Sequence, residues 1–226
     1  MKMTDLVKSF VKNDSGCAAV FEELNIDFCC GGDVSLQTAC LEQGLKTDEV
    51  YQRLMESPTS DEKDISALTP TELTTHIEST HHIYLKEALP RLTALMEKVC
   101  QAHSSRHPEL KPLQAVFENL RADLEPHLLK EERVLFPLIR KLERDSLGLK
   151  MKAAEGPVRV MRQEHDRVGE LLKQMRILAN GYVTPDDGCQ SFQLLYTELK
   201  KLEEDTHLHS HKENNLLFPA TRRGAN

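Results

Sequence analysis

The chain has 226 residues, a net charge of −7, a hydrophobic fraction of 39% and a charged fraction of 29%. This length allows one large domain or two smaller ones, and the hydrophobic content is sufficient for a packed core. An acidic chain repels nucleic-acid phosphates, and no apolar run approaches the roughly 20 residues of a membrane-spanning helix. The first residues carry scattered charges and no apolar stretch of signal-peptide length. We therefore expect a cytoplasmic protein that binds neither nucleic acid nor membrane.

Two residue types stand out in the composition, with six cysteines and ten histidines. A reducing cytosol disfavours structural disulfides. The cysteines do not form a Cys-x-x-Cys pattern, so a zinc ribbon is not indicated. The high histidine count is the first indication of a metal site.

Residues 1–57 predict a small domain of short helices. Asp33 and Thr47 occupy positions typical of helix N-caps, and the Gly-Gly pair at 31–32 indicates a turn. Residues 58–69 are mostly polar and carry a proline, which is typical of a linker between domains.

Residues 70–226 predict four long helices. Their expected spans are about 70–101, 109–145, 155–179, and from after Pro185 to about 218. Pro90 predicts a kink in the first, and Asn180-Gly181 is typical of a helix end. Almost no segment alternates in the way a strand does. We expect an all-α fold, an up-down-up-down four-helix bundle preceded by the small helical domain.

One pattern occurs twice in the predicted bundle. HLLKEERVLFP at 127–137 and HSHKENNLLFP at 209–219 share His-x-x-x-Glu-x-x-x-Leu-Phe-Pro in the same register. Residues four apart lie on one face of a helix, so each His and Glu can point at the same object. His82 precedes His127 by 45 residues and His165 precedes His209 by 44, which resembles a duplicated helical hairpin.

These positions give one histidine on each long helix and a glutamate on two of them. The candidate metal ligands are His82, His127, Glu131, His165, His209 and Glu213. Six ligands are too many for one tetrahedral zinc, but they suit two metal ions with bridging carboxylates. Mixed nitrogen and oxygen ligation fits iron best and manganese less well. A single His-x-x-x-Glu is more often a solvated surface pair, but apolar residues such as Leu124 and Leu128 share this face.

The remaining histidines are assigned other places. Because His81 and His82 are adjacent, at most one points directly into the core, and Leu85 and Leu89 favour His82. We expect His76 and His81 at the surface or orienting a ligand, His207 and His211 in solvent, and His103 and His107 in a connecting loop without special role. Glu164 and Asp123 are either exposed carboxylates or groups that orient ligands.

The stretch NIDFCCGGDVSL at 25–36 contains adjacent cysteines, Cys29 and Cys30. Such a pair does not readily form a relaxed disulfide and is too close for standard metal spacing. A thiol at a helix N-terminus has a lowered pKa and greater thiolate character, which is one interpretation of the pair. Two small buried residues in a tight turn are the other.

Together, DFCCGG, HHIYLKEALPRL, HLLKEERVLFP, RQEHD and HSHKENNLLFP resemble the repair-of-iron-centres family, the ScdA/YtfE/DnrN type. The resemblance covers essentially the whole chain. It implies a haemerythrin-like C-terminal domain with two non-haem iron ions, cycling between Fe2+ and Fe3+ and bridged by oxo and carboxylate groups. His82, His127, His165 and His209 would be terminal ligands, and Glu131 and Glu213 would bridge. It also implies repair of iron–sulfur clusters damaged by nitric oxide or peroxide, assisted by Cys29 and Cys30 in redox chemistry or transfer.

Oxygen-carrying haemerythrins use five histidines and two carboxylates, whereas this chain offers four and two. The more open site is less suited to oxygen storage and leaves positions for nitric oxide. We expect an iron donor to proteins with damaged or apo clusters rather than a classical enzyme. A gas-binding sensor and a nitric oxide reductase remain alternatives, since all three need the same ligands. The sequence does not identify the reductant, the client protein, or whether the protein is a monomer or a homodimer.

Overall fold

The computed structural model describes residues 1–57, 65–144 and 152–223. Within these ranges the chain is largely helical and contains no β-strand, apart from an isolated antiparallel bridge between Leu6 and Ser35. The prediction of an all-α fold is confirmed. No helix in these ranges combines the length and apolar character needed to cross a bilayer.

The chain forms two compact units, each described by itself. The first comprises Met1–Thr75, Ile139–Glu155 and His207–Asn226, and the second comprises His76–Leu138 and Gly156–Thr206. The predicted linker at 58–69 lies largely outside the described residues, which resume with a 3-10 turn, η1 (Ile65–Ala67). The predicted domain boundaries stay a prediction.

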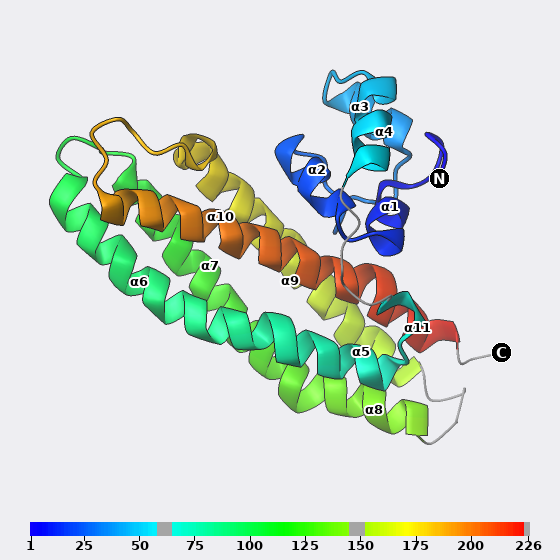
Figure 1. The fold of residues 1–226 in the computed structure, drawn as a ribbon. Coiled ribbons are helices and arrows are strands. Elements are labelled where there is room, and N and C mark those ends of the chain that lie inside the picture. The colour runs from blue at the N-terminus through cyan, green and yellow to red at the C-terminus, as the bar shows by residue number, and fades with distance from the viewer. Residues whose placement is uncertain (58–64, 145–151, 224–226) are drawn as a thin grey trace. The chain divides into compact units, whose positions relative to one another are not determined.

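Four long helices form the second unit (Figure 1). Its elements are the π-helical turn η2 (Glu78–His82), α6 (Ile83–His103), α7 (Leu110–Lys130), the π-helical turn η3 (Glu131–Leu135), α9 (Lys152–Leu178) from Gly156 onward, the 3-10 turn η5 (Asn180–Tyr182) and α10 (Gln190–His211) as far as Thr206. α6 continues through Pro90, where a kink was predicted.

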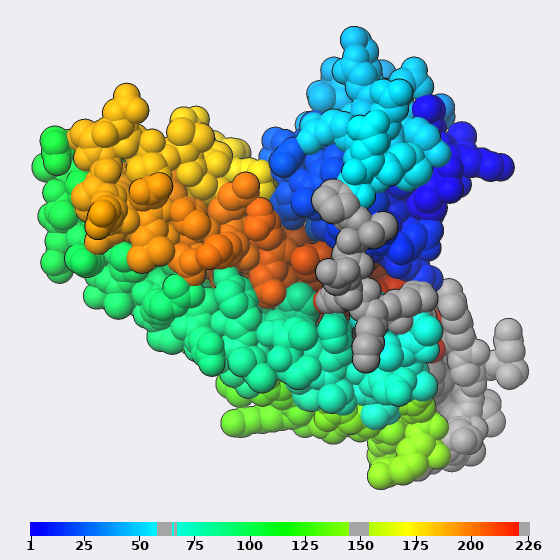
Figure 2. Space-filling view, in the orientation of Figure 1, coloured from blue at the N-terminus to red at the C-terminus, as the bar shows by residue number. Residues whose placement is uncertain are grey.

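Polar pairs between the long helices define the order of the helices. They join α6 to α7, α7 to α9, α9 to α10 and α10 back to α6: Thr93–Arg121, Asp123–Arg167, Arg176–Glu203 and Arg91–Glu198. Figure 2 shows the atoms of α6 and α10 lying against each other along the bundle. Because short connections join α6 to α7 and α9 to α10, neighbours run antiparallel, and the predicted up-down-up-down bundle is confirmed.

The bundle core follows from helical periodicity. On α6, Leu85, Leu89, Leu92 and Met96 recur every three or four residues, and each is at most 2% exposed. Burying each such side chain contributes roughly 1.5–3 kcal/mol. This apolar stripe fixes the rotation of α6 about its axis and therefore the direction of the polar residues that share its face.

Short helices form most of the first unit. They are α1 (Val7–Asn13), α2 (Cys17–Glu23), α3 (Leu36–Glu42), α4 (Thr47–Glu56), α5 (Pro70–Ile77), α8 (Phe136–Arg144), the π-helical turn η6 (Lys212–Leu217) and α11 (Phe218–Arg223). Phe10, Phe21 and Phe28 are at most 2% exposed and lie at the centre of its core, and Leu208 packs against this cluster.

Two predicted N-caps are wrong. The side chain of Ser35, not Asp33, caps α3 by accepting a hydrogen bond from the backbone N–H of Thr38. Asp33 instead pairs with Lys8. α4 has Lys46 at its N-cap position and no side-chain cap, so Thr47 is already its first helical residue.

The predicted end of α9 agrees with the structure, whereas the predicted start of α10 does not. α9 ends at Leu178, and Gly181 has a φ of +66°, as the predicted helix stop requires. α10 begins only at Gln190, because a turn closed by the Gly188 N–H and the Pro185 carbonyl comes first.

Candidate metal centre

A fully buried carboxylate, Glu131, faces two histidines from different helical segments. Its Oε2 lies 3.3 Å from Nε2 of His82, and its Oε1 lies 3.2 Å from Nε2 of His127. Both histidines are 1% exposed. The two oxygens of one carboxylate are therefore divided between two imidazoles.

His165 on α9 joins this group from a third side. Its Nε2 lies 3.2 Å from Nε2 of His127, and the side chain is 2% exposed. His127, Glu131 and His165 each offer a ligand atom, all within 4.8 Å of one another. Ligands bound about 2.1 Å from one ion are separated by about 3.0–3.4 Å, so the observed separations are those of a metal coordination shell.

Two carboxylates orient the imidazoles. Nδ1 of His82 donates to Oε1 of Glu132 at 2.9 Å, and Nδ1 of His127 donates to Oε2 of Glu164 at 2.8 Å. A hydrogen on Nδ1 leaves the lone pair on Nε2, the atom that faces Glu131. The orienting role considered for Glu164 agrees with this contact, whereas Asp123 pairs with Arg167.

The sequence reasoning missed Glu132. Its signal was present in Lys86, which follows His82 by one helical turn and also binds Glu132. Lys130 likewise binds Glu164, three residues after His127. In both cases the lysine about one turn after the histidine binds the same carboxylate as the histidine does.

These contacts keep both carboxylates ionised. The hydrogen bond from His127 lowers the pKa of Glu164 to about 2, with a further contribution from Lys130 and against the effect of burial. Burial acts to raise the pKa of Glu132, but hydrogen bonds from Lys86 and His82 outweigh it and the pKa is lowered. Negative charge on the Nδ1 side strengthens each imidazole as an Nε2 donor.

The residues present fit a metal ion. Three imidazole Nε2 atoms and one carboxylate converge in a buried interior, and a carboxylate there is costly unless it is compensated by positive charge. Imidazole with carboxylate is a donor set typical of iron and manganese.

The other predicted Glu–His pair is built in the same way. His209, on α10, places Nε2 3.4 Å from Oε1 of Glu213, and the two side chains are 1% and 0% exposed. Two further members of the repeat, Leu217 and Phe218, are also buried. Both copies of His-x-x-x-Glu are thus interior, and the solvated-surface reading is wrong for each.

A π-helical turn coincides with each of these positions. His82 ends η2, Glu131 begins η3, and Glu213 lies in η6. A π-turn adds one residue to a helical turn and is frequent at functional sites. It changes the direction of the following side chains without breaking the helix.

Known proteins share both parts of the chain. Residues 73–221 match the haemerythrin HHE cation-binding domain, and residues 4–57 match the ScdA_N domain, a domain of unknown function (DUF542). A probable iron–sulfur cluster repair protein of Haemophilus influenzae is 35% identical over 208 residues, covering 90% of both chains. The iron–sulfur cluster repair protein YtfE of Dickeya chrysanthemi is 36% identical over 208 residues, 91% of both. ScdA of Staphylococcus haemolyticus is 31% identical over 203 residues, 89% of this chain and 90% of the relative.

The chain belongs to the YtfE/ScdA family. The resemblance inferred from the sequence motifs is therefore confirmed, together with the haemerythrin-like character of the C-terminal part. A cation-binding domain is also what the buried imidazole and carboxylate groups fit.

Two other histidines of this YtfE/ScdA chain are more buried than the sequence analysis allowed. His81, expected at the surface or orienting a ligand, is 4% exposed, and its Nδ1 binds Asp205 at 2.8 Å, so the surface alternative is wrong. His211, expected in solvent, is 2% exposed, and its Nδ1 donates to the carbonyl of Phe28 at 3.1 Å. His207 is half-buried and binds Glu22.

The cysteine pair lies in a turn held by one aspartate. The carboxylate of Asp27 accepts the backbone N–H groups of Cys29, Cys30 and Gly31. Cys29 is 7% exposed, and the two sulfurs are 3.8 Å apart. The expectation of a thiol at a helix N-terminus is wrong, since α3 begins only at Leu36.

The thiol of Cys29 is correspondingly protonated. The hydrogen bond with Cys30 raises its pKa well above the usual value, and burial acts in the same direction. The catalytic role assigned to the pair stays a prediction.

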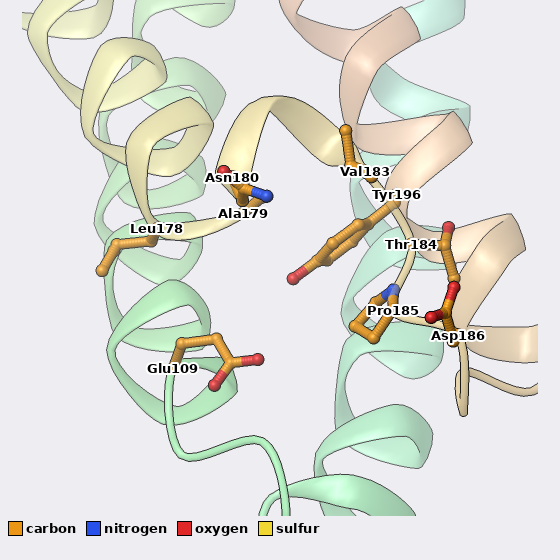
Figure 3. Close-up of a pocket in the computed structure, with 9 residues that line it drawn as sticks. All are labelled: Glu109, Leu178, Ala179, Asn180, Val183, Thr184, Pro185, Asp186 and Tyr196. Carbon is orange, nitrogen blue, oxygen red and sulfur yellow. The ribbon is translucent and has the colours of Figure 1, made fainter.

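A cavity of about 380 Å³ lies elsewhere in the bundle (Figure 3). It is lined by Glu109, Tyr196 and the segment that follows α9. Glu109 precedes Glu131 by the length of α7, so the cavity is on the order of 30 Å from the histidine cluster along that helix.

Proposed function

We propose that the protein holds two iron ions and uses them to repair damaged iron–sulfur clusters. The observation that supports the proposal most directly is the position of the Glu131 carboxylate. Its two oxygens face imidazoles from separate helical segments. A carboxylate placed in this way suits a bridge between two ions better than a single-ion ligand.

We propose that His209 and Glu213 complete the set with His82, His127, Glu131 and His165. Leu202, in the bundle core, and His209 are both on α10 and are separated by two helical turns, so they share a face. Each ion would then be bound by two imidazoles, and the two carboxylates would be shared between the ions. An oxo bridge is a further prediction. The number of protein ligands leaves positions for nitric oxide as a small ligand.

When bound, such a pair of ions supplies one-electron redox chemistry and iron that can be released. The chain's own residues set the conditions for both. Glu132 and Glu164 keep the Nε2 lone pairs directed inward, and their ionised carboxylates favour a positively charged occupant. The buried site excludes bulk water from the imidazoles and carboxylates.

The relatives are named iron–sulfur cluster repair proteins, which supports the same role here. Proteins with damaged or apo clusters are the proposed partners. A cytoplasmic location is proposed as well, and all six cysteines are free thiols, as suits a reducing compartment. Cys29 and Cys30 remain proposed redox or transfer groups, supported by Asn214, which follows Glu213 and places Nδ2 3.7 Å from the Cys30 sulfur.

Metal analysis tests the site. Protein purified without added metal should contain about two irons per chain with visible charge-transfer bands that bleach on reduction. Glu131→Leu should lose the paired-iron bands while remaining helical, and Glu170→Leu, an exposed glutamate on α9, should keep them. Retention of both irons and their bands in Glu131→Leu would show that the ligand assignment is wrong.

Function is tested separately. Iron-loaded protein should reactivate an enzyme whose cluster was damaged by nitric oxide, and the Glu131→Leu variant should not. Sustained consumption of nitric oxide with an electron donor, without reactivation, would contradict repair and favour the reductase alternative.

A further inference from the structure

A second pair of chemically active side chains lies far from Glu131. His103 is the last residue of α6, and its Nε2 lies 3.1 Å from the sulfur of Cys189. Because α6 begins directly after His82, this pair is on the order of 30 Å from that histidine along the helix. The sequence analysis placed His103 in a connecting loop, and that placement is wrong because His103 is still helical.

The two partners differ in their exposure. His103 is 6% exposed, whereas Cys189 is exposed in the segment that leads into α10. Figure 2 shows the segment between α9 and α10, in amber, at the surface. A reagent in solvent can therefore reach the sulfur but not the imidazole behind it.

Among the described residues, the thiol is the single hydrogen-bond partner of the His103 imidazole. The ring of Phe192 packs 5.3 Å from the imidazole, centroid to centroid. Among the described residues, Nδ1 of His103 has no hydrogen-bond partner. The neighbouring His107 is held apart, with Nδ1 bound to Glu109 at 3.0 Å and Nε2 bound to Asp187 at 2.9 Å.

A metal site does not account for the pair. In the parts of the chain that the structure describes, no group of three ligand atoms includes His103 or Cys189. Two protein ligands are fewer than the three or four that zinc takes in proteins. An exposed thiol against a buried imidazole is instead the arrangement of an activated nucleophile and its base.

We propose that Cys189 is a nucleophilic thiol that forms a mixed disulfide with low-molecular-weight disulfides, and that His103 carries the proton. The thiol hydrogen moves to Nε2 of His103 as the sulfur attacks one sulfur of the reagent. A new S–S bond forms to Cys189 and the reagent's S–S bond breaks. The leaving thiolate takes the proton from His103, so one thiol and one disulfide are consumed and one of each is produced.

Charged residues near Cys189 indicate which disulfides should react with it fastest. Asp186 and Asp187, both exposed, precede Cys189 by three and two residues. Asp187 is partly compensated by Arg106 at 3.1 Å, whereas Asp186 lines the open cavity of Figure 3. Carboxylates beside the thiol favour a cationic or uncharged disulfide over an anionic one.

The test measures Cys189 alone. Tryptic cleavage after Arg176 and Lys200 gives a peptide whose single cysteine is Cys189, so mass spectrometry of quenched samples follows its modification by cystamine. At pH 7 the full-length protein should react at least tenfold faster than His103→Gln, because glutamine can hydrogen-bond to sulfur but cannot accept its proton. Cystamine should also react faster than oxidised glutathione, which is anionic.

The control is His107→Gln, which changes the adjacent imidazole that does not touch sulfur and should alter the rate by less than about twofold. Equal rates for the full-length protein and a folded His103→Gln would overturn the proposal. The unmodified chain gives an independent criterion. A free thiol with a pKa of about 8.5 reacts about fiftyfold faster at pH 8.5 than at pH 6.5, in proportion to its thiolate fraction. A rise below tenfold is expected here, and a rise of about fiftyfold would refute the role of His103.

Discussion

Glu164 offers a direct test of how the protein orients His127, a proposed metal ligand. Its carboxylate accepts the Nδ1 hydrogen of His127 at 2.8 Å and does not itself face Glu131. Glu164→Gln keeps the shape and an acceptor oxygen but removes the charge. Glu164→Leu removes the acceptor as well, so His127 is free to rotate or to change tautomer.

The expected magnitude follows from this contact. Removing a group that orients a metal-bound histidine typically weakens metal binding about 10–100-fold, or about 1.4–2.7 kcal/mol. The Glu164 side chain is 26% exposed, and water screens part of its charge. We therefore expect Glu164→Gln near the lower end of this range and Glu164→Leu near the upper end.

Competition with a chelator of known affinity measures the effect on ferrous iron binding. Glu170→Gln is the matched control, because Glu170 is an exposed carboxylate on the same helix. It should bind iron as the unmodified protein does. If Glu164→Leu also binds iron with unchanged affinity, His127 either is not a ligand or does not depend on Glu164.

Two further predictions concern stability. Burial lowers the pKa of His211 to about 4, below its unfolded value of 6.5, so the unfolded chain takes up the proton first as pH falls. The free energy of unfolding should decrease by up to about 3 kcal/mol between pH 6.5 and 4. His211→Asn should flatten this dependence in urea titrations, and an unchanged slope would contradict the assignment. A Cβ on Gly32 would lie 2.6 Å from the Phe28 carbonyl oxygen, so Gly32→Ala should lose about 1–3 kcal/mol. Gly169→Ala, whose Cβ meets nothing within 4 Å, should gain about 0.5–1 kcal/mol, and equal urea midpoints for the two variants would refute the clash.

The four-helix bundle could be predicted because it depends on local periodicity. Leu85, Leu89 and Leu92 define one face of α6 from sequence alone, and that face is buried. The same phase placed His82, His127 and His165 in the interior, where the structure has them. For each of these three histidines, the spacing from apolar residues on the same helix was sufficient to predict that the side chain is buried.

The burial of His81 could not be predicted in this way. Its partner, Asp205, is 124 residues away, and nothing on α6 indicates it. The π-helical turn η2 also contributes, because its additional residue changes the phase at which His81 and His82 leave the helix. The assumption that only one of two adjacent histidines is interior holds for a regular α-helix and fails here.

The prediction for His211 is wrong for a different reason. It was assigned to solvent because it lies two residues from His209, on the far side of a regular helix. That side is covered by the segment containing Phe28, whose carbonyl oxygen accepts the hydrogen of His211 Nδ1. Asn215 also donates to this carbonyl, at 3.4 Å, so the far side is a polar contact surface for the N-terminal residues. Helical periodicity identifies two faces but not what covers the second one.

The orienting carboxylates show why metal binding and bundle stability should depend on each other. His82 precedes α6 and its acceptor Glu132 follows α7, whereas His127 is on α7 and its acceptor Glu164 is on α9. Each imidazole is therefore fixed by the next helix around the bundle rather than by its own. Small displacements of one helix move the acceptor away from the histidine of another, so a loosened bundle binds metal less tightly. Conversely, a metal ion that binds only the folded state raises the free energy of unfolding by about 2.7 kcal/mol at a concentration 100 times its dissociation constant. A thermal shift on iron binding that is reduced in Glu164→Leu but kept in Glu170→Gln would demonstrate this coupling.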